Sequence, residues 1–387
     1  MRIKKLVLFG AGKIGRSFIG QLFSRGGYEV VFIDIYKQVI DALNEKQFYN
    51  VIIKSDTDTT LKIRNVRGVW AEDKQAVINE IASADLLAVS IGQNGLPMVM
   101  PLIAAGLLKR FESLENTALD IIIAENLRNA ANYFFDKLSK LLPRNYPIRD
   151  LVGLVETSIG KMVPIMLKKD IKEDLLQVFA EPYNNLILDE LAFKNPIPKI
   201  DGLSPKKNMK AWVDRKLFVH NLGHAATAYF GYSYNPDFVY LYEALEVPEI
   251  IYKVKETMLQ SADLLLVKYP DEFTRNALVE HIDDLLARFQ NKALGDTIFR
   301  VGSDLLRKLS KDDRLVGAIN LAIELDMPYD KIQEALFCAF QFRAKDENGL
   351  MLPADLKFIE IYNSGVEEVL ATICGLNPEE ILSTKCI

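Results

Sequence analysis

The chain has 387 residues, and at about 150 residues per domain this length predicts two or three domains. Hydrophobic residues make up 49% and charged residues 26%, which is typical of globular protein and excludes an intrinsically disordered chain. Lys and Arg number 47 against 52 Asp and Glu, so the formal net charge is −5 and we expect no binding to nucleic acid or to an anionic membrane.

Cysteine and histidine are scarce, with three of each in the chain. Three separate Cys without a CxxC motif predict neither a disulfide framework nor a zinc site, so we expect a cytoplasmic, metal-independent protein. The apolar run Leu6–Phe9 is too short for a signal sequence, and no stretch is apolar for long enough to span a bilayer.

The first part of the chain alternates short apolar runs with helical patterns. Apolar runs without polar alternation are typical of parallel strands buried on both faces, and their alternation with helices predicts a Rossmann-type, doubly wound α/β sheet over residues 1–195. The expected strands are 6–9, 30–33, 86–91, 121–124 and 151–155, the expected helices are 14–25, 36–46, 97–111 and 127–141, and 51–53 with 61–63 should form an inserted hairpin.

Pro and Gly cluster over residues 195–202, and strand patterns nearly disappear beyond this segment. Helical patterns follow, several of them with a proline where a helix could begin. We therefore expect a mostly α-helical second domain over 196–387 that binds substrate and carries the catalytic residues. Its expected helices lie near 206–230, 248–268, 271–289, 314–325 and 328–343.

A glycine-rich loop follows the first expected strand. Its GxGxxG spacing permits a tight turn, a close approach of a pyrophosphate to the backbone and close packing of helix on strand, which together predict a dinucleotide site. The residues of the motif are Gly10, Ala11, Gly12, Lys13, Ile14 and Gly15. A glycine turn without a ligand is the alternative.

Asp34 ends the second expected strand, 24 residues after Gly10. At that place a carboxylate accepts hydrogen bonds from the hydroxyls of an adenosine ribose and repels a 2′-phosphate, so the sequence favours NAD over NADP. Lys37 lies close enough in sequence to keep NADP open, and a solvated Asp at a strand end is the alternative.

The expected helix near 206–230 carries Lys216, Asn221 and His224. At about 100° per residue these fall at roughly 0°, 140° and 80° around the helix axis, within one arc. Gly223 in the same segment would let a substrate or a nicotinamide ring come close.

Such a trio can interconvert an alcohol and a ketone without a metal. A desolvated Lys216 can act as general base and, as ammonium, as general acid. Asn221 can donate a hydrogen bond to the carbonyl oxygen, and His224 can hold a neighbouring hydroxyl or orient the Lys. A helix with a solvated Lys, a capping-type Asn and a hydrogen-bonded core His is the alternative that the spacing leaves open.

Four segments resemble motifs of the mannitol-1-phosphate 5-dehydrogenases, which belong to the polyol-specific long-chain dehydrogenases: GAGKIGRSFIG, AENLRNA, DRKLFVHNLGHAATAYFG and RVGSDLLRKLSKDDRL. The resemblance extends in order from residue 6 to about 345. It implies NAD-dependent interconversion of fructose 6-phosphate and mannitol 1-phosphate. Lys216, Asn221 and His224 match the catalytic signature of that family, and Asn126 matches its second oxyanion-hole Asn.

The segment RVGSDLLRKLSKDDR contains Arg300, Arg307, Lys308 and Arg314, and such a cluster can bind a phosphoryl group. It is similar to the sugar-phosphate members of the family, and we favour Arg300 and Lys308, with Arg307, over Arg314. Basic side chains paired with neighbouring Asp residues are the alternative.

One position departs from the family pattern. Gly160 and Lys161 stand where relatives usually have an Asp-Arg pair, so the identity of the substrate is open. The alternatives are a dehydrogenase of a free polyol, a reductase of a ketouronate such as tagaturonate or fructuronate, and a non-catalytic NAD-binding regulator. Neither the oligomeric state nor the physiological direction follows from the sequence.

Overall fold

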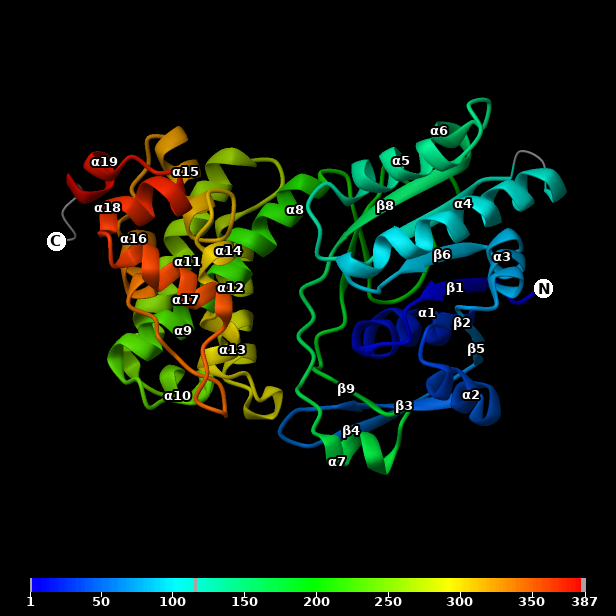
Figure 1. Ribbon diagram of the computed structural model, residues 1–387, viewed down its shortest axis with the longest axis horizontal. Helices are drawn as coiled ribbons and strands as arrows, with labels where there is room; N and C mark the ends of the chain where they lie inside the picture. The colour runs from blue at the N-terminus through cyan, green and yellow to red at the C-terminus, as the bar shows by residue number, and fades with distance from the viewer. Residues whose placement is uncertain (1, 115–116, 384–387) are drawn as a thin grey trace. The chain divides into compact units, whose positions relative to one another are not determined.

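The structure is a computed structural model in which residues 2–114 and 117–383 are described. It divides into two compact units, Met1–Met209 and Lys210–Ile387 (Figure 1). The first is built around a β-sheet and the second from helices, and each is considered by itself.

Eight strands form the main sheet of the first unit: β1 (Lys5–Phe9), β2 (Glu29–Asp34), β5 (Val66–Trp70), β6 (Leu86–Val89), β7 (Leu119–Ile123), β8 (Val152–Ser158), β10 (Leu186–Asp189) and β11 (Leu203–Lys206). Their order is β11-β10-β8-β7-β6-β1-β2-β5, and every neighbouring pair is parallel except β8 and β10. The strand order reverses between β1 and β6, and in open α/β sheets ligands bind at the carboxyl ends of strands beside such a point.

The helices of the first unit cover both faces of this sheet (Figure 1). The helical elements of the first unit are the π-helical turn η1 (Gly15–Gly20), α1 (Gln21–Arg25), α2 (Lys37–Lys46), α3 (Lys74–Ala82), η2 (Gln93–Gly95), α4 (Leu96–Ser113), α5 (Ala130–Leu141) and α6 (Ile148–Leu151), with α7 (Lys168–Glu173) beside a smaller sheet. Alternate residues of β1 point to opposite faces. Leu6 and Leu8 join a core with η1, α1 and α2, while Val7 and Phe9 join a core with α3, α4 and α5.

A second, smaller sheet has the order β4-β3-β9, with β3 (Phe48–Ile53), β4 (Thr59–Arg64) and β9 (Val178–Ala180). The antiparallel pair of β3 and β4 confirms the predicted hairpin, and β9 adds a parallel strand on its other side. No pattern around residues 178–180 had indicated a strand, because three residues are too few to show a period.

The helical unit contains α8 (Met209–Arg215), η3 (Lys216–Asn221), α9 (Leu222–Tyr234), α10 (Leu241–Leu245), α11 (Pro248–Lys268), α12 (Arg275–Phe289), η4 (Lys292–Leu294), α13 (Ile298–Gly302), α14 (Leu305–Lys308), α15 (Val316–Glu324), α16 (Asp330–Phe340), α17 (Pro353–Tyr362), α18 (Val366–Val369), η5 (Leu370–Cys374) and α19 (Pro378–Ser383). Helix α9 is its central element and packs against α10, α11, α13 and α16. Its residues 225–229 are completely buried, as expected for a helix that is apolar on all sides.

The expected fold class is confirmed, and the expected strands and helices are all present with shifted ends. The segment 196–209, which its Pro and Gly content assigned to the second domain, belongs to the first unit because β11 extends the sheet beside β10. Among the described residues, no helix is both long and apolar enough to cross a bilayer.

Two glycines of the loop after β1 differ in how much space surrounds them. A Cβ at Gly15 would lie 2.0 Å from the carbonyl oxygen of Gly10, whereas a Cβ at Gly12 would meet no atom within 4 Å. We expect Gly15→Ala to lower the free energy of unfolding by about 1–3 kcal/mol, because the backbone must move, and Gly12→Ala to change it by less than about 0.5 kcal/mol. Urea denaturation of both variants measures this, and equal stabilities would contradict it.

Candidate active site

The glycine loop lies at the carboxyl end of β1, beside the reversal of strand order. Gly10 has a φ of +99°, its amide donates to the carbonyl oxygen of Ile33 at 2.8 Å, and a Cβ there would lie 2.1 Å from the carbonyl oxygen of Ser90. Only glycine fits this close approach of the loops after β1 and β6. Gly12 is exposed, so its backbone is accessible to a ligand.

The carboxylate of Asp34 joins the loops that follow β1 and β2. Its Oδ2 accepts a hydrogen bond from the amide of Ala11 at 2.7 Å, and its Oδ1 accepts one from the amide of Tyr36 at 2.9 Å. The carboxylate therefore sits next to the glycine loop, where the sequence had placed it. The ammonium of Lys37, which had kept NADP open, pairs instead with Asp41 at 2.8 Å.

Asn126 lies in the loop after β7, and its side chain is exposed. The alternative of a helix N-cap does not hold, because α5 starts at Ala130 and Asn129 occupies the N-cap position. The loop is tied to the loop after β6. Glu125, which sequence reasoning missed, accepts hydrogen bonds from the amides of Ile91 and Gly92 at 2.7 and 3.0 Å.

In the helical unit, Lys216 and Asn221 are the first and last residues of the π-helical turn η3. The expected geometry was a regular α-helix, in which a separation of five residues leaves two side chains about 140° apart. In a π-helix, hydrogen bonds connect residues five apart, so residues five apart lie on nearly the same face. The π turn therefore brings Asn221 closer to the face of Lys216 than the sequence predicted.

The electrostatic surroundings of Lys216 favour its neutral form. Burial, together with the nearby guanidinium of Arg314, lowers the pKa of Lys216 to about 8. The same guanidinium lies 3.5 Å from the carbonyl oxygen of Asn221. Arg314, which sequence reasoning had ranked below Arg300 and Lys308, is thus the basic residue of this cluster that contacts the segment of Lys216 and Asn221.

The imidazole of His224 lies 2.9 Å from Oδ2 of Asp296 and stacks on Phe289 with 4.8 Å between ring centroids. Burial holds its pKa well below the usual 6.5, with a contribution from Arg300, so the ring is neutral. The expectation that Gly223 leaves room for a ligand is wrong. A Cβ there would lie 2.4 Å from Sδ of Met258, so the glycine serves the packing of α9 on α11.

The basic cluster divides into residues with different partners. Arg300 pairs with Asp296, and Arg307 pairs with Asp304 and Asp313. The ammonium of Lys308 is 2.6 Å from the carbonyl oxygen of Val301, and burial with nearby Arg314 and Arg307 lowers its pKa to about 7. Arg300, Lys308 and Arg314 all contribute to the lowered pKa of His224, and the side chains of Arg300 and Arg307 are both about half exposed.

Lys161, at the position that departs from the family pattern, is buried. Its ammonium donates to the carbonyl oxygens of Glu181 and Tyr183 at 3.1 and 2.5 Å and to Oδ1 of Asn184 at 3.2 Å. These contacts hold the segment 181–184 within the first unit. They give Lys161 a structural role in that unit.

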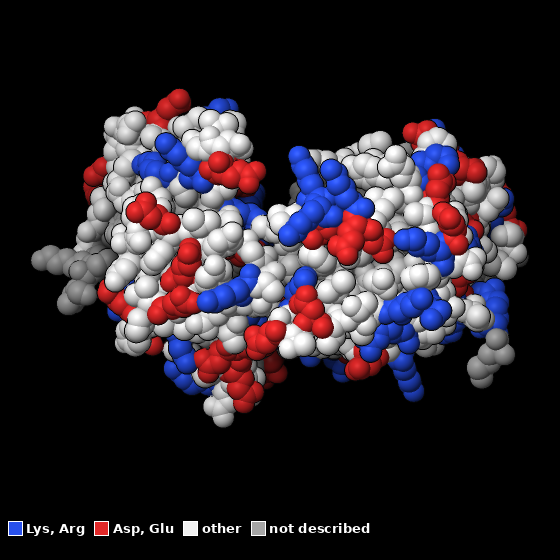
Figure 2. Space-filling view, turned by 90° about the horizontal axis from the view of Figure 1, so that it is seen from below, with Lys and Arg blue, Asp and Glu red and all other residues white. Residues whose placement is uncertain are grey.

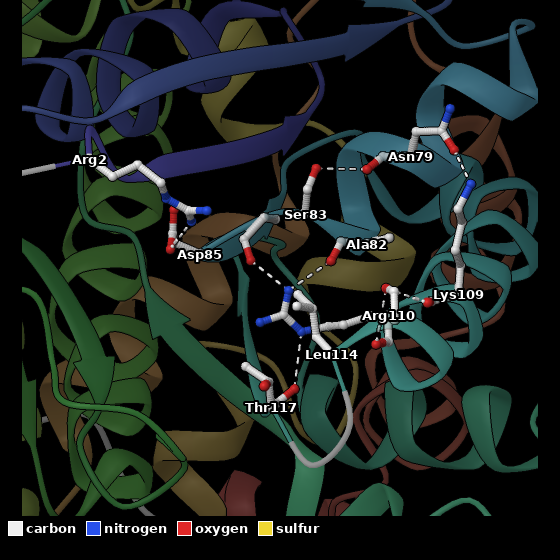
Figure 3. Close-up of a pocket in the computed structure, with 11 residues that line it drawn as sticks. Arg2, Asn79, Ala82, Ser83, Asp85, Lys109, Arg110, Leu114 and Thr117 are labelled. Atoms are coloured by element: carbon white, nitrogen blue, oxygen red, sulfur yellow. Dashed lines mark hydrogen bonds and ion pairs between the residues drawn. The ribbon is translucent and has the colours of Figure 1, made fainter.

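A cavity of about 570 Å³ opens at the other end of the sheet, at the amino ends of β1 and β6 (Figure 3). Arg110 lines it, and its guanidinium donates to the carbonyl oxygens of Ala82, Ala84 and Thr117 at 2.8–3.0 Å. No predicted site residue lines this cavity, and the bonds of Arg110 give it a structural role, because they join the segments that precede β6 and β7. Over the face drawn in Figure 2, acidic and basic side chains are interspersed.

Two family models together match nearly the whole chain: the mannitol dehydrogenase Rossmann domain over residues 4–202 and the mannitol dehydrogenase C-terminal domain over residues 208–372. The chain belongs to the mannitol dehydrogenase family. The mannitol-1-phosphate 5-dehydrogenase of Streptococcus mutans is 33% identical over 98% of this chain and 97% of its own length, and that of Buchnera aphidicola is 30% identical over 98% and 96%.

Solved structures share the fold of this family member. The mannitol 2-dehydrogenase of Pseudomonas fluorescens, in a ternary complex with NAD and D-mannitol, matches with a TM-score of 0.76 at 18% identity and covers 98% of this chain and 90% of its own. A D-sorbitol dehydrogenase in substrate-free form matches with a TM-score of 0.78 at 16% identity, over 97% and 89%.

The lowered pKa of Lys308 predicts a pH dependence of stability. Folding lowers this pKa from 10.5 to about 7, so the unfolded chain binds more protons between these values and the free energy of unfolding rises with pH. Relative to the wild type, Lys308→Met should therefore be more stable at about pH 7 than at about pH 9, by about 1–3 kcal/mol. Urea denaturation at both pH values measures this, with Lys311→Met at an exposed lysine as control. An equal change in both variants would contradict it.

Proposed function

We propose that this chain is an NAD-dependent dehydrogenase that interconverts fructose 6-phosphate and mannitol 1-phosphate. The observation that carries the proposal is the π turn that presents Lys216 and Asn221 on one face, with the pKa of Lys216 lowered to about 8. The similarity to mannitol-1-phosphate 5-dehydrogenases along 98% of the chain supports it.

The first unit supports the choice of cofactor. Gly12 leaves open space beside an exposed backbone, and the carboxylate of Asp34 lies against the glycine loop, as the pyrophosphate and ribose of a dinucleotide require. When bound, NAD supplies the acceptor of the hydride. The residues that would hold it are those of the loop from Gly10 to Gly15, together with Asp34, whose negative charge disfavours NADP.

The residues of the helical unit handle the proton. In the oxidative direction the neutral amine of Lys216 takes the proton of the substrate hydroxyl, and in the reductive direction its ammonium returns a proton to the forming alkoxide. The amide of Asn221 donates a hydrogen bond to the same oxygen, and the neutral ring of His224 holds a neighbouring hydroxyl. The role of Asn126 as a second donor stays a prediction.

Uncompensated positive charge supports a phosphorylated substrate. Arg300, Lys308 and Arg314 all contribute to the lowered pKa of His224, and burial lowers the pKa of Lys308 by more than the nearby carboxylates of Asp304 and Asp355 raise it. A phosphoryl group would supply further negative charge. Arg307 remains a weaker candidate, because two Asp side chains already pair with it.

A dehydrogenase of a free polyol is the second candidate. Arg300 is paired with Asp296 and Lys308 is hydrogen-bonded to a carbonyl oxygen, so both are accounted for without a phosphate. The same observations apply to a ketouronate reductase. The alternative of a non-catalytic NAD-binding regulator was based on Gly160 and Lys161. The hydrogen bonds of Lys161 give that residue a structural role, so it no longer favours a regulator. A small molecule as the binding partner and a cytoplasmic location stay predictions.

The pKa of Lys216 predicts the pH dependence of the reaction. Because the amine must be neutral to accept a proton, oxidation of mannitol 1-phosphate should rise with pH through about 8 and reduction of fructose 6-phosphate should fall over the same range. Lys216→Ala should lower kcat by about 10²–10⁴-fold, and the rise near pH 8 should disappear. Steady-state rates of NADH formation and consumption measure both, with Lys210→Ala at an exposed lysine as control. A variant with near wild-type rates at all pH values would remove Lys216 from the reaction.

The substrate class is decided by comparing substrates with and without phosphate. Among fructose 6-phosphate, fructose, tagaturonate and fructuronate, we expect NADH to be consumed fastest with fructose 6-phosphate. Arg300→Ala should raise the KM for fructose 6-phosphate by about 10-fold or more and affect activity on fructose by a much smaller factor, because a charge-assisted bond to phosphate is worth about 1.5–3 kcal/mol. Arg275→Ala, at an exposed arginine, is the control. Preference for fructose with no effect of Arg300→Ala would favour the free-polyol enzyme.

A further inference from the structure

Asp296 joins two residues that the proposed function uses separately. One carboxylate oxygen, Oδ2, lies 2.9 Å from Nε2 of His224, and the other, Oδ1, pairs with the guanidinium of Arg300. The side chain of Asp296 is 5% exposed, whereas that of Arg300 is 50% exposed. A buried carboxylate thus has an internal imidazole on one side and a solvent-accessible cation on the other.

The backbone around Asp296 is fixed from two directions. Its carbonyl oxygen accepts a hydrogen bond from the amide of Leu241 at 3.0 Å, and the amide of Ile298 donates to the carbonyl oxygen of Val239 at 2.8 Å. The hydroxyl of Thr297 accepts from the amide of Arg300 at 3.1 Å and caps α13. Because α10 and α13 both pack on α9, these bonds hold Asp296 in a fixed position relative to His224 on α9.

The pairing determines which nitrogen of His224 carries the proton. A carboxylate only accepts hydrogen bonds, so the neutral ring must carry its proton on Nε2 and leave Nδ1 as an acceptor. The stacking on Phe289 fixes the plane of the ring. The other ring beside it is His220, and the charged groups that act on it besides Asp296 are Arg288, Arg300, Lys308 and Arg314. Burial, together with these cations, lowers the pKa of the ring, and the carboxylate of Asp296 selects the tautomer.

We propose that Asp296 is a positioning residue that sets the tautomer of His224 and links its place to that of Arg300, so that the bound phosphoryl group and the hydroxyl held by Nδ1 are presented at a fixed separation. The inference rests on the proposed function, since it assigns Arg300 to the phosphoryl group. Through this link between Arg300 and His224, the phosphate of the substrate contributes to turnover as well as to binding.

Replacement of the carboxylate by an amide separates the two roles of Asp296. In Asp296→Asn, the amide oxygen can still accept from Arg300, and the amide nitrogen is then left to donate to His224, which forces the proton of the ring onto Nδ1. Loss of the correct tautomer in a catalytic Asp–His pair is known to lower kcat strongly while the geometry is kept. We expect kcat with fructose 6-phosphate to fall by at least about 10-fold, whereas KM changes by less than about 3-fold.

The tautomer itself can be observed without any activity measurement. The chain has three His, so ¹⁵N-histidine labelling gives three ring systems, and His220→Gln and His281→Gln identify that of His224. In the wild type we expect the neutral Nε2–H form of His224 from about pH 6 to 9, and in Asp296→Asn the Nδ1–H form. Asp283→Asn, at a half-exposed aspartate on α12, should leave both the ring signals and kcat as in the wild type.

The outcomes separate this proposal from the proposed function. Wild-type protein that turns over no substrate of the panel would reject the proposed function, and the histidine spectra would still test the tautomer. Active wild-type protein with an unchanged kcat in Asp296→Asn, or His224 with its proton on Nδ1 in the wild type, would reject the role of Asp296. Should Asp296→Asn not fold, the wild-type spectrum alone decides.

Coupling to Arg300 is tested by a double-mutant cycle. If Asp296 links His224 to Arg300, the effects of Arg300→Ala and Asp296→Asn on kcat/KM for fructose 6-phosphate should be less than multiplicative by about 3-fold or more. Multiplicative effects would show that Asp296 orients His224 without any link to the phosphate, and they would overturn that part of the proposal.

Discussion

Burial of positive charge within the helical unit is the constraint on which the rest of its chemistry depends. Lys216 and Lys308 have lowered pKa values to which Arg314 contributes, and both Arg300 and Arg314 contribute to the lowered pKa of His224. A desolvated ammonium costs free energy unless a carboxylate compensates it; Asp296 and Asp313 pair with Arg300 and Arg314, whereas burial outweighs the carboxylates near Lys308. The lowered pKa makes an amine available as a base near neutral pH. The buried positive charge favours an anionic ligand.

The architecture of the first unit was largely predictable because its strands are buried on both faces. Leu6–Phe9 and Val30–Ile33 are apolar at every position, and that pattern fits few structures other than a parallel sheet. The strands β10 and β11 could not be recognised. Leu203–Lys206 is half-buried and contains a proline, and its strand form depends on pairing with β10, which no local pattern encodes.

The site could be predicted only as a set of residues. The glycine spacing and Asp34 follow from a local requirement, and the structure places them together. Lys216, Asn221 and His224 were found through their spacing, but the π turn that aligns the first two leaves no signal in the sequence. Arg314 was ranked below Arg300 and Lys308, and Asp296 was missed, because their importance comes from contacts with Asn221 and His224, about 70–90 residues away in the chain.

The π turn also restricts how this part of the chain can vary in length. Residues 209–234 form one continuous helical rod in which η3 contains the wider turn. Removal of one residue between Lys216 and Asn221 could be absorbed as an ordinary α-helical turn, so the rod itself would survive. The same deletion would leave Lys216 and Asn221 four residues apart on an α-helix, where residues at that separation also share a face, so the two side chains would stay aligned. The segment therefore tolerates the loss of one residue between these positions, whereas the gain of one would rotate the preceding helix by about 100° relative to α9.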